Sequence, residues 1–219
     1  MTIIQCVNNL DLGGLERVVL ILGRQLRARS IGCEIVCIED RGTLADEAER
    51  NGLPVIALHA EKAGKRSALR SMISHLKQVD APVVLHSHNF KPFWYAARAR
   101  FYGVAIGHVH TRHGAFLRRH RFLWRYRLMR RWTDAIATVS ADGRDQLARW
   151  SGLRPQDIHV VPNGVDTDTY RPADSKMAVR QRLGWTQPGA VIITVARLAP
   201  EKDLATLLRA VALMPQVAW

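Results

Sequence analysis

The sequence predicts an α/β fold in which a parallel β-sheet carries helices on both faces. Short runs rich in β-branched residues alternate with helical periodicities from the first residue onward, and this alternation is typical of βα units. With 219 residues, 47% of them apolar, the chain is long enough to bury a core of that kind. We expect a strand in each of the seven runs that precede residue 162: 3–7, 33–38, 54–58, 82–86, 105–110, 134–139 and 158–161.

The helices expected between these strands are amphipathic. After the first strand, five apolar residues recur at the spacing of one helix face: Leu15, Val18, Val19, Leu22 and Leu26. Arginines occupy the opposite face, so this helix should pack on the sheet through its apolar side. Further helices are expected at about 43–51, 65–78, 92–102, 119–131 and 141–150.

The chain changes character near residue 162. Three prolines and an Asn-Gly pair interrupt regular structure in 162–188, which we interpret as a linker that follows a first domain at 1–161. A strand at 190–195 and a helix after it then begin a second βα series in 189–219. One βα unit cannot bury its own faces, so this second domain is expected to be incomplete.

Composition restricts the compartment and the partners. Three cysteines without a CxxC pair indicate neither a disulfide framework nor a zinc knuckle, which favours a reducing compartment. The N-terminus is too short and polar for a signal peptide and no run is long enough to span a bilayer, so we expect a cytoplasmic protein. A net charge of +13 favours polyanions such as acidic lipids, diphosphates or nucleic acid. Nucleic acid is not expected, because the basic residues are spread over helices without a nucleic-acid motif.

Two glycines, Gly13 and Gly14, lie where the first strand gives way to the first helix. They allow a ligand to approach the backbone, and the free N–H groups of the first helical turn attract anions. The dinucleotide fingerprint GxGxxG is absent, so the pattern alone fits a tight turn as well as it fits a phosphate site.

Five histidines follow the fourth and fifth predicted strands: His86, His88, His108, His110 and His113. Ligands of open α/β sheets bind at the carboxyl ends of strands, so these two groups are expected to line one crevice. His86 with His88, and His108 with His110, have the spacing of metal pairs on one strand face. The more common role for His86, His108 and His110 is that of packed or hydrogen-bonded histidines. His88 and His113 are expected in loops and are the stronger functional candidates.

Two further motifs place charged residues in predicted loops. Asp166 and Asp168 form a DxD sequence, but they follow Pro-Asn-Gly, so turn formation is expected and no metal is assigned. Arg197 and Lys202 lie at the strand–helix junction of the second βα series. Together with a helix N-terminus they could neutralise a diphosphate, and solvated surface charges are the alternative.

Taken in order, these segments resemble the retaining nucleotide-sugar glycosyltransferases of family 4. The matching stretches are GGLERV at 13–18, HSHN at 86–89, TRHG at 111–114, VPNGVD at 161–166 and ARLAPEKD at 196–203. Members of this family have the GT-B fold, in which two Rossmann-like domains face each other across a cleft. The resemblance implies a doubly wound Rossmann-like sheet in an N-terminal, acceptor-binding domain, followed by a truncated donor-binding domain.

The resemblance also implies roles for individual residues. His113 would contact the donor sugar at the reacting centre and is the expected catalytic residue. The residues expected at the donor diphosphate are Gly13, Gly14, Arg197 and Lys202. The residues expected on the acceptor side are Glu16, His88, Asn89 and Arg112.

The chemistry implied by the family needs no metal or other cofactor. Negative charge develops on the departing nucleoside diphosphate, and fixed cations with helix N–H groups stabilise it. The partners would be a nucleotide-diphosphate sugar and a saccharide or lipid-linked acceptor, with retention, in cell-surface polysaccharide or glycolipid synthesis. The base pocket and paired glutamates of the family are not found in 189–219, so this chain by itself is expected to be inactive.

Residues 117–132 combine arginine with aromatic and aliphatic side chains. Family members that use lipid-linked acceptors often carry such a surface, so this segment is expected to lie on an anionic inner leaflet. A solvated helix with Phe122, Leu123, Tyr126 and Met129 packed inward is the alternative, and both hold if the arginines face outward. A non-catalytic acceptor- or membrane-binding domain is the alternative to an enzyme.

Overall fold

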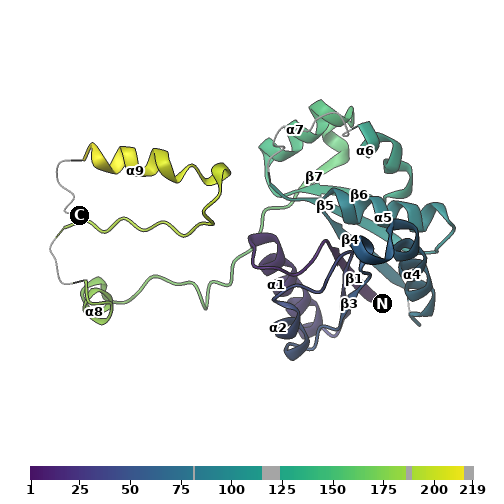
Figure 1. Cartoon of the computed structure of the whole chain (residues 1–219), viewed down its shortest axis with the longest axis horizontal. Coiled ribbons are helices and arrows are strands. Elements are labelled where there is room, and N and C mark those ends of the chain that lie inside the picture. The colour runs from purple at the N-terminus through teal and green to yellow at the C-terminus, as the bar shows by residue number, and fades with distance from the viewer. Residues whose placement is uncertain (81, 115–123, 186–188, 215–219) are drawn as a thin grey trace. The chain divides into compact units, whose positions relative to one another are not determined.

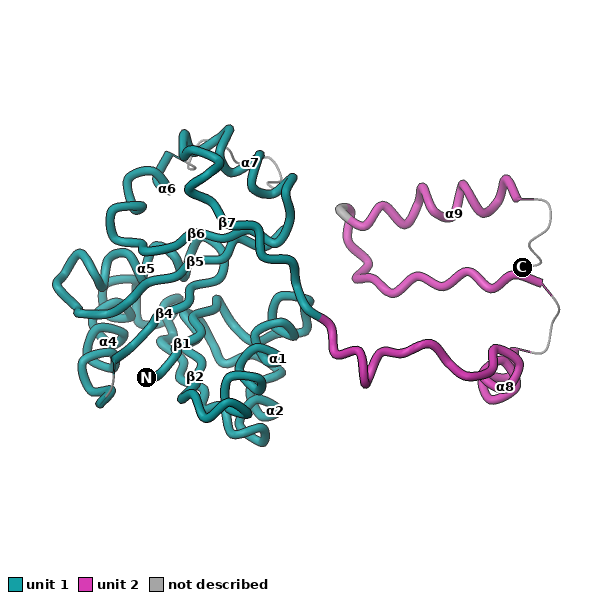
Figure 2. The backbone as a smooth tube through the Cα atoms, turned by 180° about the vertical axis from the view of Figure 1, so that it is seen from behind, with its two compact units in different colours: residues 1–164 teal, residues 165–219 magenta. Residues whose placement is uncertain are grey.

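The computed structural model describes residues 1–80, 82–114, 124–185 and 189–214 and divides the chain into a first unit, Met1–Gly164, and a second unit, Val165–Trp219 (Figure 2). The first unit is built on one sheet of seven parallel strands in the order β3-β2-β1-β4-β5-β6-β7 (Figure 1). The strands are β1 (Thr2–Val7), β2 (Gly32–Cys37), β3 (Val55–Ala57), β4 (Val83–His88), β5 (Gly107–Arg112), β6 (Ala135–Thr138) and β7 (Ile158–Val160). The predicted parallel α/β sheet is confirmed.

Helices cover both faces of this sheet (Figure 1). Alternate residues of β2 show why: Cys33 and Ile35 pack with α1 and α2, whereas Val36 packs in the cluster that includes α4 and α5. A third cluster joins α5, α6 and α7 over β6. The α-helices of the first unit are α1 (Gly14–Ala28), α2 (Ala45–Arg50), α3 (Ala60–Ala63), α4 (Lys65–Gln78), α5 (Phe90–Phe101), α6 (Trp124–Met129) and α7 (Ala141–Ser151). The 3-10 helices among its described residues are η2 (Arg130–Trp132) and η3 (Pro155–Asp157).

The second unit differs from the sequence prediction. Its helices are α8 (Lys176–Arg182), η4 (Pro200–Lys202) and α9 (Leu204–Ala212), so the predicted linker 162–188 contains a helix. The strand predicted at 190–195 was wrong: these residues have no regular structure. A strand is stabilised by backbone hydrogen bonds to a neighbour, and the described part of the second unit offers no strand to pair with.

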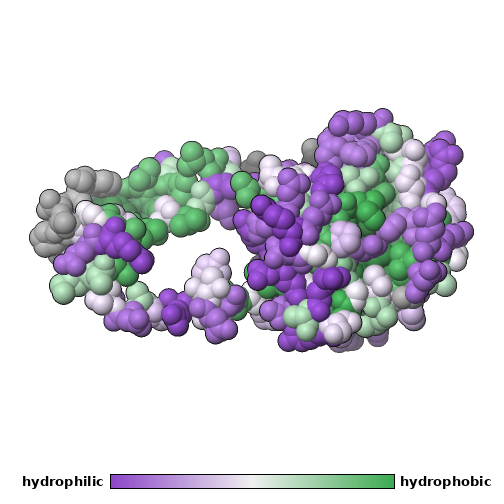
Figure 3. Space-filling view, turned by 90° about the horizontal axis from the view of Figure 1, so that it is seen from below, coloured by the Kyte–Doolittle hydropathy of each residue, from purple (hydrophilic) through white to green (hydrophobic). Residues whose placement is uncertain are grey.

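Many apolar side chains of the second unit are exposed, although Val211 is buried. Val195 and Leu198 each keep 94% of their surface accessible, and hydrophobic residues gather on this unit in Figure 3. In the first unit, by contrast, residues of the same kind fill three buried clusters. The stability of the described chain therefore resides in the first unit.

A chain ending at Gly164 is expected to unfold cooperatively, with a free energy of unfolding within about 0.5 kcal/mol of that of the whole chain. The three buried clusters consist of residues from the first unit, so they remain intact. Urea unfolding followed by circular dichroism measures this. The shortened chain should also bind less of a hydrophobic dye, and loss of its cooperative transition would contradict the assignment.

Candidate functional site

A pocket of about 210 Å³ opens at the carboxyl edge of the sheet in the first unit. It lies beside β4, where the strand order reverses relative to β1, which is the place where open α/β sheets bind ligands. Three segments line it: one face of α1, the ends of β4 and β5, and the stretch 161–164 after β7. The lining residues are Val18, Ile21, Leu22, Gln25, His86, His88, Thr111, His113, Val161, Pro162, Asn163 and Gly164.

One wall of the pocket is a stripe of α1. Val18, Ile21 and Leu22 are only partly buried and face the pocket, whereas the neighbouring Val19 and Leu20 are buried against the sheet. The predicted apolar face is thus divided: Val18 and Leu22, one turn apart, line the pocket, whereas the adjacent Val19 is buried against the sheet. The pocket consequently has one apolar wall.

The N-terminus of α1 carries Gly13, Gly14 and Glu16. Gly13 is the N-cap residue and has an extended backbone. The Glu16 carboxylate folds back against Gly13, over the first helical turn, while no atom lies within 4 Å of the position of a Cβ on Gly14. These three predicted residues precede the stretch of α1 that lines the pocket and are not among its lining residues.

The opposite wall is polar and contains His88 and His113. Nδ1 of His88 lies 3.0 Å from Nε2 of His113, and Nε2 of His88 lies 2.7 Å from Oε1 of Gln5. Beside them, Nε2 of His86 lies 2.8 Å from Oγ1 of Thr111. His88 is the last residue of β4, so its predicted position in a loop was wrong, whereas His113 directly follows β5. The structure therefore brings the two stronger histidine candidates together.

Asn89 holds the segment that carries His113. Its Oδ1 accepts a hydrogen bond from the backbone N–H of His113 at 3.1 Å and lies 3.5 Å from Nη1 of Arg112. Its backbone has φ 63° and ψ 178°, a combination that costs non-glycine residues on the order of 1–3 kcal/mol. Asn89 and Arg112 do not line this pocket, and the observed contacts of Asn89 position His113.

Burial keeps these histidines neutral. Loss of hydration lowers the pKa of His86 and of His113 to about 4, with smaller contributions from nearby His113 and Arg112, respectively. The pKa of His88 is lowered well below its ordinary value for the same reason. A neutral imidazole offers one donor and one acceptor, and the described residues that line the pocket include no acidic or cationic side chain. Such a site combines an apolar wall with neutral hydrogen-bonding groups, which suits an uncharged ligand that carries hydrogen-bonding groups.

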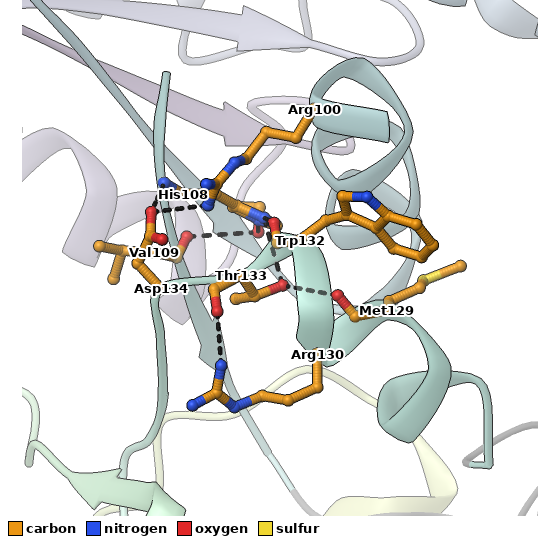
Figure 4. Close-up of polar contacts among 9 residues, drawn as sticks. Arg100, His108, Val109, Met129, Arg130, Trp132, Thr133 and Asp134 are labelled. Atoms are coloured by element: carbon orange, nitrogen blue, oxygen red, sulfur yellow. Dashed lines mark hydrogen bonds and ion pairs between the residues drawn. The ribbon is translucent and has the colours of Figure 1, made fainter. Parts of the chain in front are cut away.

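His108 and His110 lie on the other face of the sheet, so the prediction that both histidine groups line one crevice was wrong for these two residues, although His113 of the same group lines the pocket. The register pairs Ser87 with His110, which places His108 and His110 on the face opposite His86 and His88. Nδ1 of His108 donates to the Trp132 carbonyl at 2.9 Å, in a network that joins β5 to the segment before β6 (Figure 4). Nδ1 of His110 donates to the Ser87 carbonyl at 3.0 Å.

These bonds confirm the interpretation of His86, His108 and His110 as hydrogen-bonded histidines. Across the described residues, no three His, Cys, Asp or Glu side chains are grouped as metal ligands would be.

Two predicted motifs follow the pocket-lining residues in the sequence. Asp166 accepts hydrogen bonds from the backbone N–H groups of Asp168 and Thr169 at 3.0 and 3.2 Å, so the predicted turn is confirmed. Arg197 lies in an irregular stretch of the second unit and Lys202 ends η4, where its side chain is exposed.

The sequence prediction missed Gln5, Thr111 and the pocket-lining stretch 161–164. Gln5 is fully buried in the centre of β1, and its polarity within the run IIQCV is the signal that could have identified it. Thr111 and 161–164 lay inside segments that were assigned to a motif and to the start of the linker.

The helices that the structure describes include none with both the length and the apolarity needed to cross a bilayer.

Two curated proteins illustrate the sequence similarity. The chain is 36% identical over 81 residues to the D-inositol 3-phosphate glycosyltransferase of Streptomyces scabiei, covering 37% of this chain and 18% of that protein. It is 29% identical over 185 residues to the alpha-maltose-1-phosphate synthase of Mycolicibacterium smegmatis, covering 74% of this chain and 46% of that protein. The chain thus spans less than half the length of either relative.

Solved structures show the same fold. The Anabaena protein HepE, in complex with UDP and glucose, superimposes with a TM-score of 0.81 at 20% identity, over 98% of this chain and 58% of HepE. A glycosyltransferase from Rickettsia africae superimposes with a TM-score of 0.80 at 19% identity, over 100% of this chain and 59% of that one.

The sequence model of Glycosyltransferase Family 4 matches residues 12–169, which include α1, the polar wall with His88 and His113, and the stretch 161–164 of the pocket. This match covers more than half of the chain, and the predicted resemblance is confirmed. The chain belongs to glycosyltransferase family 4.

Proposed function

We propose that this glycosyltransferase moves a sugar from a nucleoside-diphosphate donor to a saccharide or lipid-linked acceptor, with retention of the anomeric configuration. The observation that carries the proposal is the neutral pair His88 and His113, which faces the apolar stripe of α1 at the carboxyl edge of the sheet. The proteins it resembles are about twice as long as the matched part, so transfer belongs to a protein in which the donor half is complete.

In this proposal, different groups contact the sugars and the diphosphate. His113 contacts the donor sugar at the reacting centre, and His88, Asn89, Arg112 and Glu16 form the acceptor side. The N-terminus of α1 at Gly13 and Gly14, with Arg197 and Lys202, stabilises the charge on the departing diphosphate. The acceptor hydroxyl attacks the anomeric carbon from the face that the diphosphate leaves, and its proton passes to the leaving phosphate. No metal or other cofactor takes part.

The test is a transfer assay on a completed protein, in which residues 1–219 are continued by the donor half of a family 4 relative. UDP-, GDP- and ADP-sugars are offered with saccharide and lipid-linked acceptors, and the released nucleoside diphosphate and the anomeric configuration of the product are measured. Transfer with retention is expected from the completed protein and no turnover from residues 1–219 alone. An inverted product, or nucleotide binding without transfer to any acceptor, would overturn the proposal.

We also propose that α6 and η2 bring the protein to the inner face of an anionic membrane, in the synthesis of a cell-surface polysaccharide or glycolipid. Residues 117–123 of the predicted surface segment lie outside the described residues. In the described part, Tyr126 and Met129 pack inward while Trp124 and Leu128 expose 56% and 49% of their surface. Arg127 and Arg131 are exposed near them, so this face combines cations with apolar side chains, as surface-bound helices do.

Sedimentation with vesicles tests the membrane contact. The double substitution Arg127→Glu and Arg131→Glu should lower binding to anionic vesicles more than tenfold, because each arginine at such a surface contributes about 1 kcal/mol. Arg24→Glu with Arg50→Glu, which changes the same charge on α1 and α2, is the matched control and should bind like the unchanged chain. Equal losses in both variants, or binding that is independent of anionic lipid, would contradict the proposed surface.

A further inference from the structure

Three polar side chains form a row that reaches the pocket wall: Gln5 of β1, His88 of β4 and His113 after β5. The row is continuous, because Oε1 of Gln5 lies 2.7 Å from Nε2 of His88 and Nδ1 of His88 lies 3.0 Å from Nε2 of His113. Gln5 is fully buried and His88 is 2% exposed, so water does not compete for these contacts. His88 and His113 line the pocket, whereas Gln5 is not among its lining residues.

A row of this kind determines which nitrogen of each ring carries hydrogen. A neutral imidazole has one N–H and one lone pair, and burial keeps both rings neutral by lowering the pKa of each histidine. A carbonyl oxygen can only accept, so Nε2 of His88 must donate to Gln5. Nδ1 of His88 then holds a lone pair, and Nε2 of His113 must donate to it.

The burial of an unpaired amide nitrogen in Gln5 is energetically unfavourable, and this supports a role for Gln5 in the row. Its Nε2 is buried and has no hydrogen-bond partner among the described residues, which costs about 1–3 kcal/mol. A leucine or methionine would fill the same position in β1 without an unpaired donor. The contact with His88 is the interaction that only a polar side chain at this position provides.

We infer that Gln5 is a positioning residue that fixes the tautomer of His113 through His88 and leaves Nδ1 of His113 as an acceptor. An acceptor on a ring in the pocket wall favours a ligand hydroxyl that donates a hydrogen bond. This inference rests on the proposed function only for the identity of that ligand. Rotation of the Gln5 amide by half a turn would reverse every donor and acceptor in the row. The orientation of one buried amide therefore sets what the pocket presents.

Nitrogen NMR of the chain labelled with ¹⁵N-histidine measures the tautomers directly, near neutral pH and without ligand. Protonated and unprotonated ring nitrogens have well-separated shifts, so each ring is read independently. We expect hydrogen on Nε2 of both His88 and His113. Hydrogen on Nδ1 of either ring would overturn the inference, whatever the transfer assay shows, and failure of the transfer assay would leave this result unaffected.

The variants Gln5→Leu and Gln5→Met test the causal step. Both should lose the single tautomer of His88 and His113 and show a mixture, while His86, bonded to Thr111, keeps its own tautomer as an internal control. A merely structural role of Gln5 would change the unfolding midpoint without changing the tautomers. Unchanged tautomers in a folded variant would refute the role of Gln5, and the unchanged chain still provides the first test if neither variant folds.

Discussion

The substitution His113→Ala is expected to lower kcat/KM of the completed protein about 100-fold, the loss typical of removing one group that contacts the reacting centre. His113 lies in the pocket wall, and its position is fixed twice, by His88 at the ring and by Asn89 at the backbone. Its removal leaves the backbone contact in place, so the fold should persist. Steady-state kinetics with circular dichroism as a check on folding measure this.

Asp168→Ala is the matched control for that substitution. The backbone N–H of Asp168 donates to Asp166 in a turn, and the substitution keeps this N–H. Its kcat/KM should therefore stay within about twofold of the unchanged protein. Normal turnover in His113→Ala, or an equal loss in both variants, would contradict the assignment of the site.

The first unit is expected to lose stability as the pH falls below about 6.5, the ordinary histidine pKa. Burial lowers the pKa of His86, His108 and His113 to about 4, and that of His88 and His110 well below its ordinary value. Between pH 6.5 and 4 the unfolded chain therefore binds more protons than the folded chain. Each such histidine removes up to about 1.4 kcal/mol per pH unit in this window, and above it the penalty vanishes.

One histidine acts in the opposite direction. Nε2 of His75 lies 2.5 Å from Oε1 of Glu34, and this bond raises the pKa of His75. Its contribution is present below the ordinary histidine pKa and is lost as the pH rises through the raised value. Since five histidines with a lowered pKa oppose this one, the net effect of acid is destabilising.

Urea unfolding at pH 7.5, 6.5 and 5.5 measures this dependence. The urea midpoint should be lowest at pH 5.5, and removal of the exposed His159 by His159→Asn should leave the difference unchanged. A midpoint that stays constant or rises on acidification would show that the buried histidines are not held neutral.

The sheet was predictable from sequence because its strands are buried by helices and read as apolar runs. Seven such runs became seven strands, with bounds that differ by one or two residues. The run at 190–195 looks the same in sequence, but its pairing depends on strands elsewhere. Strand propensity alone therefore could not determine its structure.

The candidate site was predictable in its location and less so in its composition. The rule that ligands bind at the carboxyl edge identified His88 and His113 correctly as neighbours. It failed for His108 and His110, because the register between β4 and β5 places these two residues on the opposite face of the sheet from His86 and His88. Gln5 was missed because its partner lies 83 residues away in the sequence.

The most direct test is backbone NMR shift mapping of the completed protein titrated with UDP-, GDP- and ADP-sugars. The largest shifts are expected at His88, Thr111, His113 and 161–164, with little change in α6 as an internal reference. His113→Ala should weaken this response for the same sugar. Shifts confined to other surfaces, or no response of the pocket residues to any of these donors, would contradict the claim that the pocket wall with His88 and His113 binds the sugar.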